Sequence, residues 1–254
     1  IHEEFGADIA EFMDEAEILI KARIDRNLVI FSLDTSGTGL HKRGHKQAMG
    51  KAPLRETISA MTLRACGYDG TQTVLDPMCG SGTYIIEAAE MAGNLLAGRA
   101  RGFAFERLQS YDADAVDLIK SNWQTRDIPQ TFYGSDRNEQ VIEFAQANAA
   151  RAGVEQSCQF TAQSLPDIKR PDGPPGIVMV NPPYGTRIGN KKQLFSLYRS
   201  FGQIMREQFT GWSVGMVTTD RVLAEATNLP WQPGGPPIAH GGLKVRLYRT
   251  GALE

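Results

Sequence analysis

The sequence predicts an α/β fold in which strands and helices alternate along the chain. Residues 74–92 have the pattern of a strand, a glycine turn and an apolar-periodic helix, and residues 176–180 form a short apolar run that ends in a turn. A short β-branched and apolar run bounded by a turn indicates a buried strand, and ligands of α/β sheets bind at the carboxyl ends of such strands. We therefore expect the functional site where these two strands end.

The turn after residue 180 combines hydrogen-bond acceptors with an aromatic ring. Its two prolines cannot donate backbone hydrogen bonds, and each keeps the residue before it extended, so the local carbonyls stay free to accept. The side-chain oxygen of Asn181 and the carbonyl of Pro182 suit the two hydrogens of an exocyclic amine, while Tyr184 can stack on the ring. The alternative is an ordinary turn, because Asn and Pro are common turn residues. The catalytic candidates are Asn181, Pro182, Pro183 and Tyr184.

A glycine-containing loop over residues 76–83 follows the first of the two strands. Gly80 and Gly82 let backbone N–H groups approach a ligand, and the start of the next helix adds positive potential for a carboxylate or a phosphate. The loop lacks the third glycine of the dinucleotide-binding pattern, so it does not predict that class of site. The candidate ligand-binding residues of the loop are Asp76, Pro77, Met78, Cys79, Gly80, Ser81, Gly82 and Thr83.

Together, the two motifs resemble those of amino-group methyltransferases that use S-adenosylmethionine. Four more segments are similar to the THUMP-associated RNA guanine-N2 methyltransferases, in particular the bacterial type that acts on large-subunit ribosomal RNA. These segments are residues 34–44, 52–57, 102–106 and 132–136. The resemblance implies a Rossmann-like class I methyltransferase sheet that ends in an antiparallel β-hairpin. It also implies S-adenosylmethionine as cofactor, RNA as partner, and methyl transfer to the N2 amine of a guanine.

The resemblance assigns the glycine loop, Asp136 and Asn181 to the cofactor. Asp136 ends the predicted strand over residues 132–136, where a carboxylate usually accepts the ribose hydroxyls of a nucleotide. As an alternative, Asp136 caps the helix that follows, and both roles are compatible.

The adenine-binding position departs from the family pattern. Relatives usually carry Asp where this chain has Ser164, and that Asp accepts the adenine amino group. Ser164, Gln163 or the nearby Asp167 takes this role, or adenine is held more weakly, and the sequence leaves the choice open.

The charges of the chain are unevenly distributed. The net charge of −2 argues against a generally basic nucleic-acid binder, and the first 17 residues hold seven acids without Lys or Arg. Between Asp34 and Glu56, in contrast, all charged residues are basic. Such a run is usually a solvated face, but here it lies next to the motifs and predicts phosphate contacts. The predicted RNA-binding residues are Lys42, Arg43, Lys46, Lys51, Arg55, Arg187, Lys191 and Lys192.

The 254 residues, 41% of them hydrophobic, are enough for one α/β core and a small appendage. We expect residues 1–50 to contain a helix over residues 1–17, a β-hairpin around residues 25–27 and a basic connector, at the end of a THUMP-containing region. Residues 51–254 are expected to form the methyltransferase domain, with one helix that starts near Pro53 and another over residues 194–209. The start at Ile1 suggests a piece of a longer protein. Within an insertion over residues 93–129, the aromatic side chains are expected to pack together rather than bind RNA.

Composition excludes several classes of protein. No apolar run approaches the length of a membrane span, and no leader with a cleavage site opens the sequence, so a soluble cytoplasmic protein is expected. Cys66, Cys79 and Cys158 lack the paired spacing of metal or redox sites, so free thiols and no metal are expected. Cys79 is expected to be a small packing residue rather than a nucleophile. The oligomeric state cannot be predicted.

Three other functions use the same features. DNA adenine-N6 methylation uses the same constellation, but the basic connector and the N-terminal hairpin resemble parts of RNA enzymes. Protein glutamine-N5 methyltransferases share Asn-Pro-Pro-Tyr, although their first motif usually contains more glycine. A non-catalytic RNA-binding scaffold is the third, and cofactor binding would distinguish it from an enzyme.

Overall fold

The computed structural model describes residues 9–11, 16–47, 54–184 and 191–254. It divides into two compact units, one holding described residues up to 44 together with 97–124, the other holding 45–96 and 125–254. The predicted border at residues 50 and 51 lies outside the described residues and stays a prediction. The sequence did not suggest that residues 97–124 belong with the first unit, because that grouping depends on contacts between distant parts of the chain.

The first unit contains the predicted hairpin. Strands β1 (Leu19–Asp25) and β2 (Leu28–Asp34) pair antiparallel, and Arg26 in the turn has a φ of 55°. Most of the helix expected over residues 1–17 lies outside the described residues, and residues 9–11 are not helical.

The inserted segment of the first unit forms a 3₁₀ turn, Ala104–Arg107, and helix α4, Ala113–Ser121. Phe103 stacks on Phe105 with ring centroids 5.4 Å apart, and Tyr111 lies 5.9 Å from Phe105. These three rings therefore pack together as expected, whereas Trp123 remains 43% exposed.

A seven-stranded sheet with the order β5-β4-β3-β6-β7-β9-β8 forms the centre of the second unit. The first five of these strands are parallel, β9 runs antiparallel to β7, and β8 pairs antiparallel with β9. The expected Rossmann-like sheet with a terminal hairpin is confirmed. The strands are β3 (Val74–Asp76), β4 (Phe132–Asp136), β5 (Cys158–Ala162), β6 (Ile177–Val180), β7 (Ser213–Thr218), β8 (Ile238–His240) and β9 (Leu243–Arg249).

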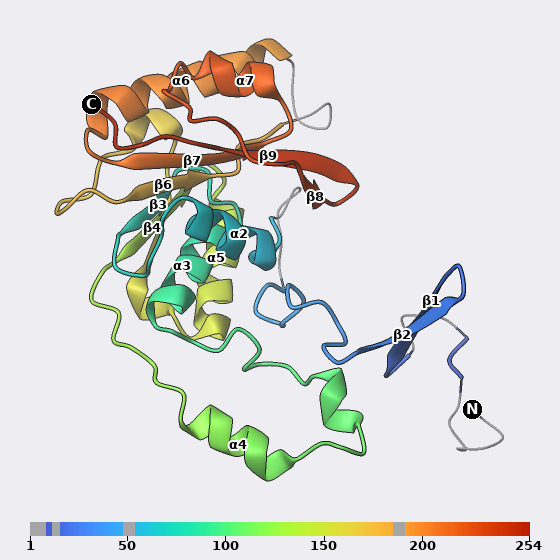
Figure 1. Ribbon diagram of the computed structural model, residues 1–254. Helices are drawn as coiled ribbons and strands as arrows, with labels where there is room; N and C mark the ends of the chain where they lie inside the picture. The colour runs from blue at the N-terminus through green and yellow to red at the C-terminus, as the bar shows by residue number, and fades with distance from the viewer. Residues whose placement is uncertain (1–8, 12–15, 48–53, 185–190) are drawn as a thin grey trace. The chain divides into compact units, whose positions relative to one another are not determined.

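Helices cover both faces of this sheet (Figure 1). One face carries α2 (Glu56–Ala65), α3 (Thr83–Ala92) and α5 (Glu139–Ala152), and the other carries α6 (Lys191–Gln208) and α7 (Arg221–Ala226). Two hydrophobic clusters fill the layers, and Trp212, Tyr84 and Phe132 are among their fully buried side chains. Short 3₁₀ turns at Glu155–Ser157 and Leu165–Asp167 complete the unit.

Helix starts are less well predicted than strands. Helix α2 begins at Glu56 rather than near Pro53, which lies outside the described residues, and α6 begins three residues before the predicted Leu194. Within the part of the chain that the structure describes, no helix combines the length and apolar character that crossing a membrane requires.

Gly202 allows α6 to approach the end of α7 closely. A Cβ atom at this position would lie 1.8 Å from the carbonyl oxygen of Thr227. Gly202→Ala should therefore lower the free energy of unfolding by about 1–3 kcal/mol through overpacking, although Ala is intrinsically the better helix former. The neighbouring exposed variant Gln203→Ala should stay within about 0.5 kcal/mol of the wild type. Urea unfolding measures both, and a Gly202→Ala protein as stable as the control would refute the close approach.

Candidate active site

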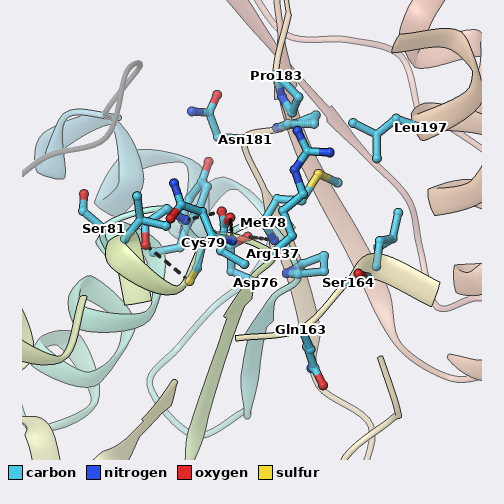
Figure 2. Close-up of a pocket in the computed structure, with 18 of the residues that line it drawn as sticks. Asp76, Met78, Cys79, Ser81, Arg137, Gln163, Ser164, Asn181, Pro183 and Leu197 are labelled. Atoms are coloured by element: carbon cyan, nitrogen blue, oxygen red, sulfur yellow. Dashed lines mark hydrogen bonds between the residues drawn. The ribbon is translucent and has the colours of Figure 1, made fainter. Parts of the chain in front are cut away.

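A cavity of about 1090 Å³ opens at the carboxyl ends of β3, β4, β5 and β6 (Figure 2). Its lining comes from the loops that follow these strands, so the site lies at the predicted edge of the sheet. Every residue predicted to be catalytic or cofactor-binding lines the cavity except Gly82. The roles assigned to these residues remain predictions, but their convergence is a property of the structure.

The two glycines of the loop after β3 serve different purposes. Gly80 has a φ of 50°, and a Cβ atom there would meet no described atom within 4 Å, so its backbone faces open space in the cavity. Gly82 has a φ of 84°, and a Cβ atom there would lie 3.0 Å from Ala145 and from the ring of Phe160. Gly82 therefore permits the close packing of the start of α3, while Gly80 leaves room for a ligand.

Asp136 joins the end of β4 to the glycine loop. One carboxylate oxygen accepts from the backbone N–H of Gly80 at 3.2 Å, and the other accepts from the N–H of Asn138 at 3.0 Å. The alternative that Asp136 caps α5 is wrong, since Asn138 immediately precedes that helix and its side chain accepts from Gln140 N–H at 3.1 Å. Asp136 is thus held in place beside the cavity.

Two carboxyl groups lie close together in this site. Asp76 is only 2% exposed, and its Oδ1 accepts from the N–H of Met78 at 3.0 Å. Burial, with a smaller contribution from the charge of Asp136, raises the pKa of Asp76 well above its usual range. A ligand group that donates hydrogen bonds or carries positive charge would therefore suit this end of the cavity.

The sequence predicted free thiols at Cys66, Cys79 and Cys158, and the structure confirms them. Cys79 is buried, and burial raises the pKa of its thiol well above the usual range, which disfavours the thiolate that a nucleophile needs. Among the described residues, no cluster of three or more His, Cys, Asp or Glu side chains could hold a metal ion.

The Asn-Pro-Pro-Tyr segment presents an unpaired acceptor to the cavity. Oδ1 of Asn181 is buried and has no hydrogen-bond partner among the described residues, whereas buried polar groups are normally paired. The carbonyl of Pro183 accepts from the hydroxyl of Tyr198 at 3.3 Å, and that hydroxyl lies 3.2 Å from Oγ1 of Thr218. Tyr184 is half-buried and packs against the hydrophobic cluster that contains Tyr84. A mere strand-ending turn does not account for the unpaired oxygen.

The residues considered for adenine separate into two groups. Ser164 and Gln163 line the cavity, and the N–H of Gln163 donates to the carbonyl of Asp136 at 3.0 Å. Figure 2 shows both residues in the loop after β5. Asp167 is not a lining residue, so the structure favours the two neighbours over it.

Sequence reasoning missed much of the cavity wall. Leu54 contributes from the segment before α2, Tyr84 from α3, and Leu165 and Pro166 from the 3₁₀ turn after β5, while α5 and α6 contribute further side chains. In sequence, the helical positions look like the core-facing stripe of an amphipathic helix, so no local signal distinguishes them. The missed helical wall residues are Gln140, Val141, Phe144, Gln193, Leu194 and Leu197, and Arg137 and Asn138 were missed in the loop after β4.

The predicted RNA-binding residues lie in different environments. Arg43 is only 3% exposed, and Nζ of Lys46 donates to the carbonyl of Leu54 and forms an ion pair with Glu56 at 3.5 Å. The sequence prediction included neither the burial of Arg43 nor the intramolecular hydrogen bond and ion pair of Lys46. Lys42, Arg55, Lys191 and Lys192 are exposed, and Lys51 and Arg187 lie outside the described residues.

Comparison with known proteins identifies the family. The model of the RMKL-like methyltransferase domain matches residues 43–231. The ribosomal RNA large subunit methyltransferase K/L of Vibrio parahaemolyticus is 40% identical over 206 residues, which cover 78% of this chain and 29% of that protein. The chain thus spans less than a third of the length of the curated relatives it matches.

Two solved structures are similar to this one. SMU.472 complexed with SAH has a TM-score of 0.83 and 28% identity, over 92% of this chain and 62% of that one. A predicted N6-adenine-specific DNA methylase from Listeria monocytogenes has a TM-score of 0.79 and 29% identity, over 92% of this chain and 60% of that one. From the family match, the sequence identity and the shared fold, the chain belongs to the RMKL-like methyltransferase domain family.

Proposed function

We propose that this chain transfers a methyl group from S-adenosylmethionine to the exocyclic N2 amine of a guanine in large-subunit ribosomal RNA. An amine is inferred as the methyl acceptor because the buried Oδ1 of Asn181 has no hydrogen-bond partner within the described chain. Asn181 and Tyr184 both line the cavity of this methyltransferase domain. Support for the RNA comes from the relatives, which are named ribosomal RNA large subunit methyltransferases.

The cavity suits the cofactor and a base together. Its volume of about 1090 Å³ slightly exceeds that of most small-molecule sites, which span roughly 300–1,000 Å³. Asp136 would accept the ribose hydroxyls, Asp76 lies beside the glycine loop for a positively charged or donating group, and Gln163 and Ser164 lie where adenine would bind. The neighbour SMU.472 was solved with SAH bound. When bound, S-adenosylmethionine supplies an electrophilic methyl group on a sulfonium.

The residues of this chain then need to orient a nitrogen lone pair and exclude water. Oδ1 of Asn181 and the carbonyl of Pro182 accept the two amine hydrogens, which draws the nitrogen out of conjugation with its ring. Tyr184 stacks on the base, which must leave its own stack to enter the cavity. The hydroxyl of Tyr198 fixes the carbonyl of Pro183, so the acceptors are held in position before the substrate arrives. The methylated nitrogen would then release its extra proton to solvent, and the demethylated cofactor would leave as S-adenosylhomocysteine, so a dedicated general base is not required.

One experiment distinguishes the three candidate substrate classes, which are RNA, DNA and protein. Radiolabelled methyl transfer from S-adenosylmethionine to total RNA, to DNA and to protein, followed by nucleoside and amino-acid analysis, should yield N2-methylguanine in RNA. Methylation of DNA adenine would instead favour the activity for which the Listeria neighbour is named. Cofactor binding without transfer to any of the three would leave only the scaffold function.

Asp136→Ala should weaken binding of S-adenosylmethionine by about tenfold to a hundredfold. One charge-assisted hydrogen-bonding group contributes about 1.5–3 kcal/mol, and each 1.4 kcal/mol is roughly tenfold in affinity. Asp167→Ala is the matched control, since this nearby acid does not line the cavity. Calorimetry measures both dissociation constants. Unchanged affinity in Asp136→Ala would refute its assignment, and weaker binding in Asp167→Ala would return that residue to the adenine site.

Asn181→Ala should abolish most methyl transfer while leaving cofactor affinity close to that of the wild type. The expected loss in kcat is about a hundredfold or more, because the amine is no longer aligned with the methyl group. Single-turnover transfer to RNA and calorimetric titration of the cofactor, on the same preparation, separate the two effects. Normal transfer by this variant would mean that the segment is only a turn.

Lys191 and Lys192 should bind RNA phosphates at the mouth of the cavity. Both are exposed in the first turn of α6, directly before the lining residue Gln193. Their joint replacement by Ala should reduce the slope of log affinity against log salt by about 0.7 for each phosphate that is no longer neutralised. The control is Lys169 and Arg170, an exposed basic pair that does not line the cavity, both replaced by Ala. Equal slopes for the two double variants would assign Lys191 and Lys192 to solvated surface.

A further inference from the structure

Asn148 is an unexpected residue in the interior of α5. Its side chain is 1% exposed, although Asn is a poor helix former and a buried amide must be hydrogen-bonded. Its buried neighbours on the same helix are small apolar residues, including Ala145, Ala149 and Ala152. A buried amide at such a position indicates a specific partner.

That partner is the glycine loop. Nδ2 of Asn148 donates to the carbonyl of Ser81 at 3.0 Å. Ser81 is one of the cavity-lining residues labelled in Figure 2. The next peptide N–H, that of Gly82, donates to the carbonyl of Cys79 at 2.9 Å. Both polar groups of the peptide between Ser81 and Gly82 are thus bonded within the protein, and the peptide cannot turn over without losing two buried hydrogen bonds.

Arg151 determines which way the amide of Asn148 points. It lies one turn further along α5, and its Nη2 donates to Oδ1 of Asn148. A guanidinium has donors and no acceptor, so it must face the oxygen of the amide, which leaves the NH₂ group for the carbonyl of Ser81. Arg151 is itself fixed, because its Nε donates to the carbonyl of His45 at 2.8 Å.

We propose that Asn148 is a positioning residue for the cofactor loop, oriented by Arg151, and that it keeps the Ser81 carbonyl turned away from the bound cofactor. With that carbonyl held on the α5 side by Asn148, the loop does not present the Ser81 carbonyl oxygen to the ligand. This inference rests on the proposed function, since it assumes that S-adenosylmethionine binds at this loop.

Asn148→Asp is the sharpest variant. It keeps the size of the side chain and an acceptor for Arg151, but it sets a carboxylate oxygen against the carbonyl of Ser81. We expect the dissociation constant and the KM for S-adenosylmethionine to rise about tenfold or more, the effect of losing one buried hydrogen bond and leaving its acceptor unpaired. The KM for RNA should not change, because the Asn-Pro-Pro-Tyr segment is untouched.

Thr250→Val controls for a purely structural effect. Thr250 is also buried, at 6% exposure, and its Oγ1 accepts from the N–H of Val214, but it does not line the cavity. This variant should lower the melting temperature with wild-type cofactor affinity. If Asn148→Asp also lowers only the melting temperature, Asn148 is a structural residue and the proposal is overturned.

Arg151→Met provides a second test if Asn148→Asp does not fold. Arg151 is an exposed residue, so the variant should fold, and it removes the group that orients the amide. Cofactor affinity should fall by a few-fold, and Arg151→Lys, which keeps a donor, should restore part of it. Wild-type affinity in Arg151→Met would refute the orienting role. If the wild type itself binds no S-adenosylmethionine, it is the proposed function that fails.

Discussion

Burial of the central strands on both faces is the constraint on which the site depends. No residue of β3 or β6 is more than 5% exposed, because helices pack against the sheet from either side. Side chains within these strands can therefore only fill the core, and a strand can present polar chemistry only where it ends. Asp76 ends β3, and Asn181 directly follows β6. The cavity gathers these residues because parallel neighbouring strands end at one edge.

At that edge, the backbone N–H and C=O groups of the loops cannot pair with a neighbouring strand, so they need other hydrogen-bond partners. Asp136 accepts from the N–H of Gly80, the N–H of Cys79 donates to the carbonyl of Ser135, and Asn148 donates to the carbonyl of Ser81. Neighbouring elements thus form hydrogen bonds with most of the loop backbone. Oδ1 of Asn181 is different, since it is buried without a partner in the described part of the chain and so identifies the point where an outside donor is needed.

Local features of this fold were predictable from sequence, whereas features that depend on distant contacts were not. The strand at residues 74–76 and the Asn-Pro-Pro-Tyr turn are encoded by adjacent residues, and the structure has them where expected. Phe144 and Leu197 line the cavity, but no sequence signal identifies them, because a cavity wall and a core stripe share one helical pattern. Arg43 looked like surface, since its burial depends on packing that a charge pattern does not contain. Helix starts differed by a few residues because caps depend on backbone geometry.

The double hydrogen bonding of Asp136 has a kinetic consequence. Both oxygens accept from backbone N–H groups of this chain, and each retains a further lone pair for a ligand. If a ligand binds Asp136 as proposed, it meets a carboxylate whose rotamer is already selected, and association does not wait for this side chain to reorganise. Among closely related complexes, association rates vary over fewer orders of magnitude than affinities do. Differences in affinity are then determined by how long a ligand stays rather than by how quickly it arrives.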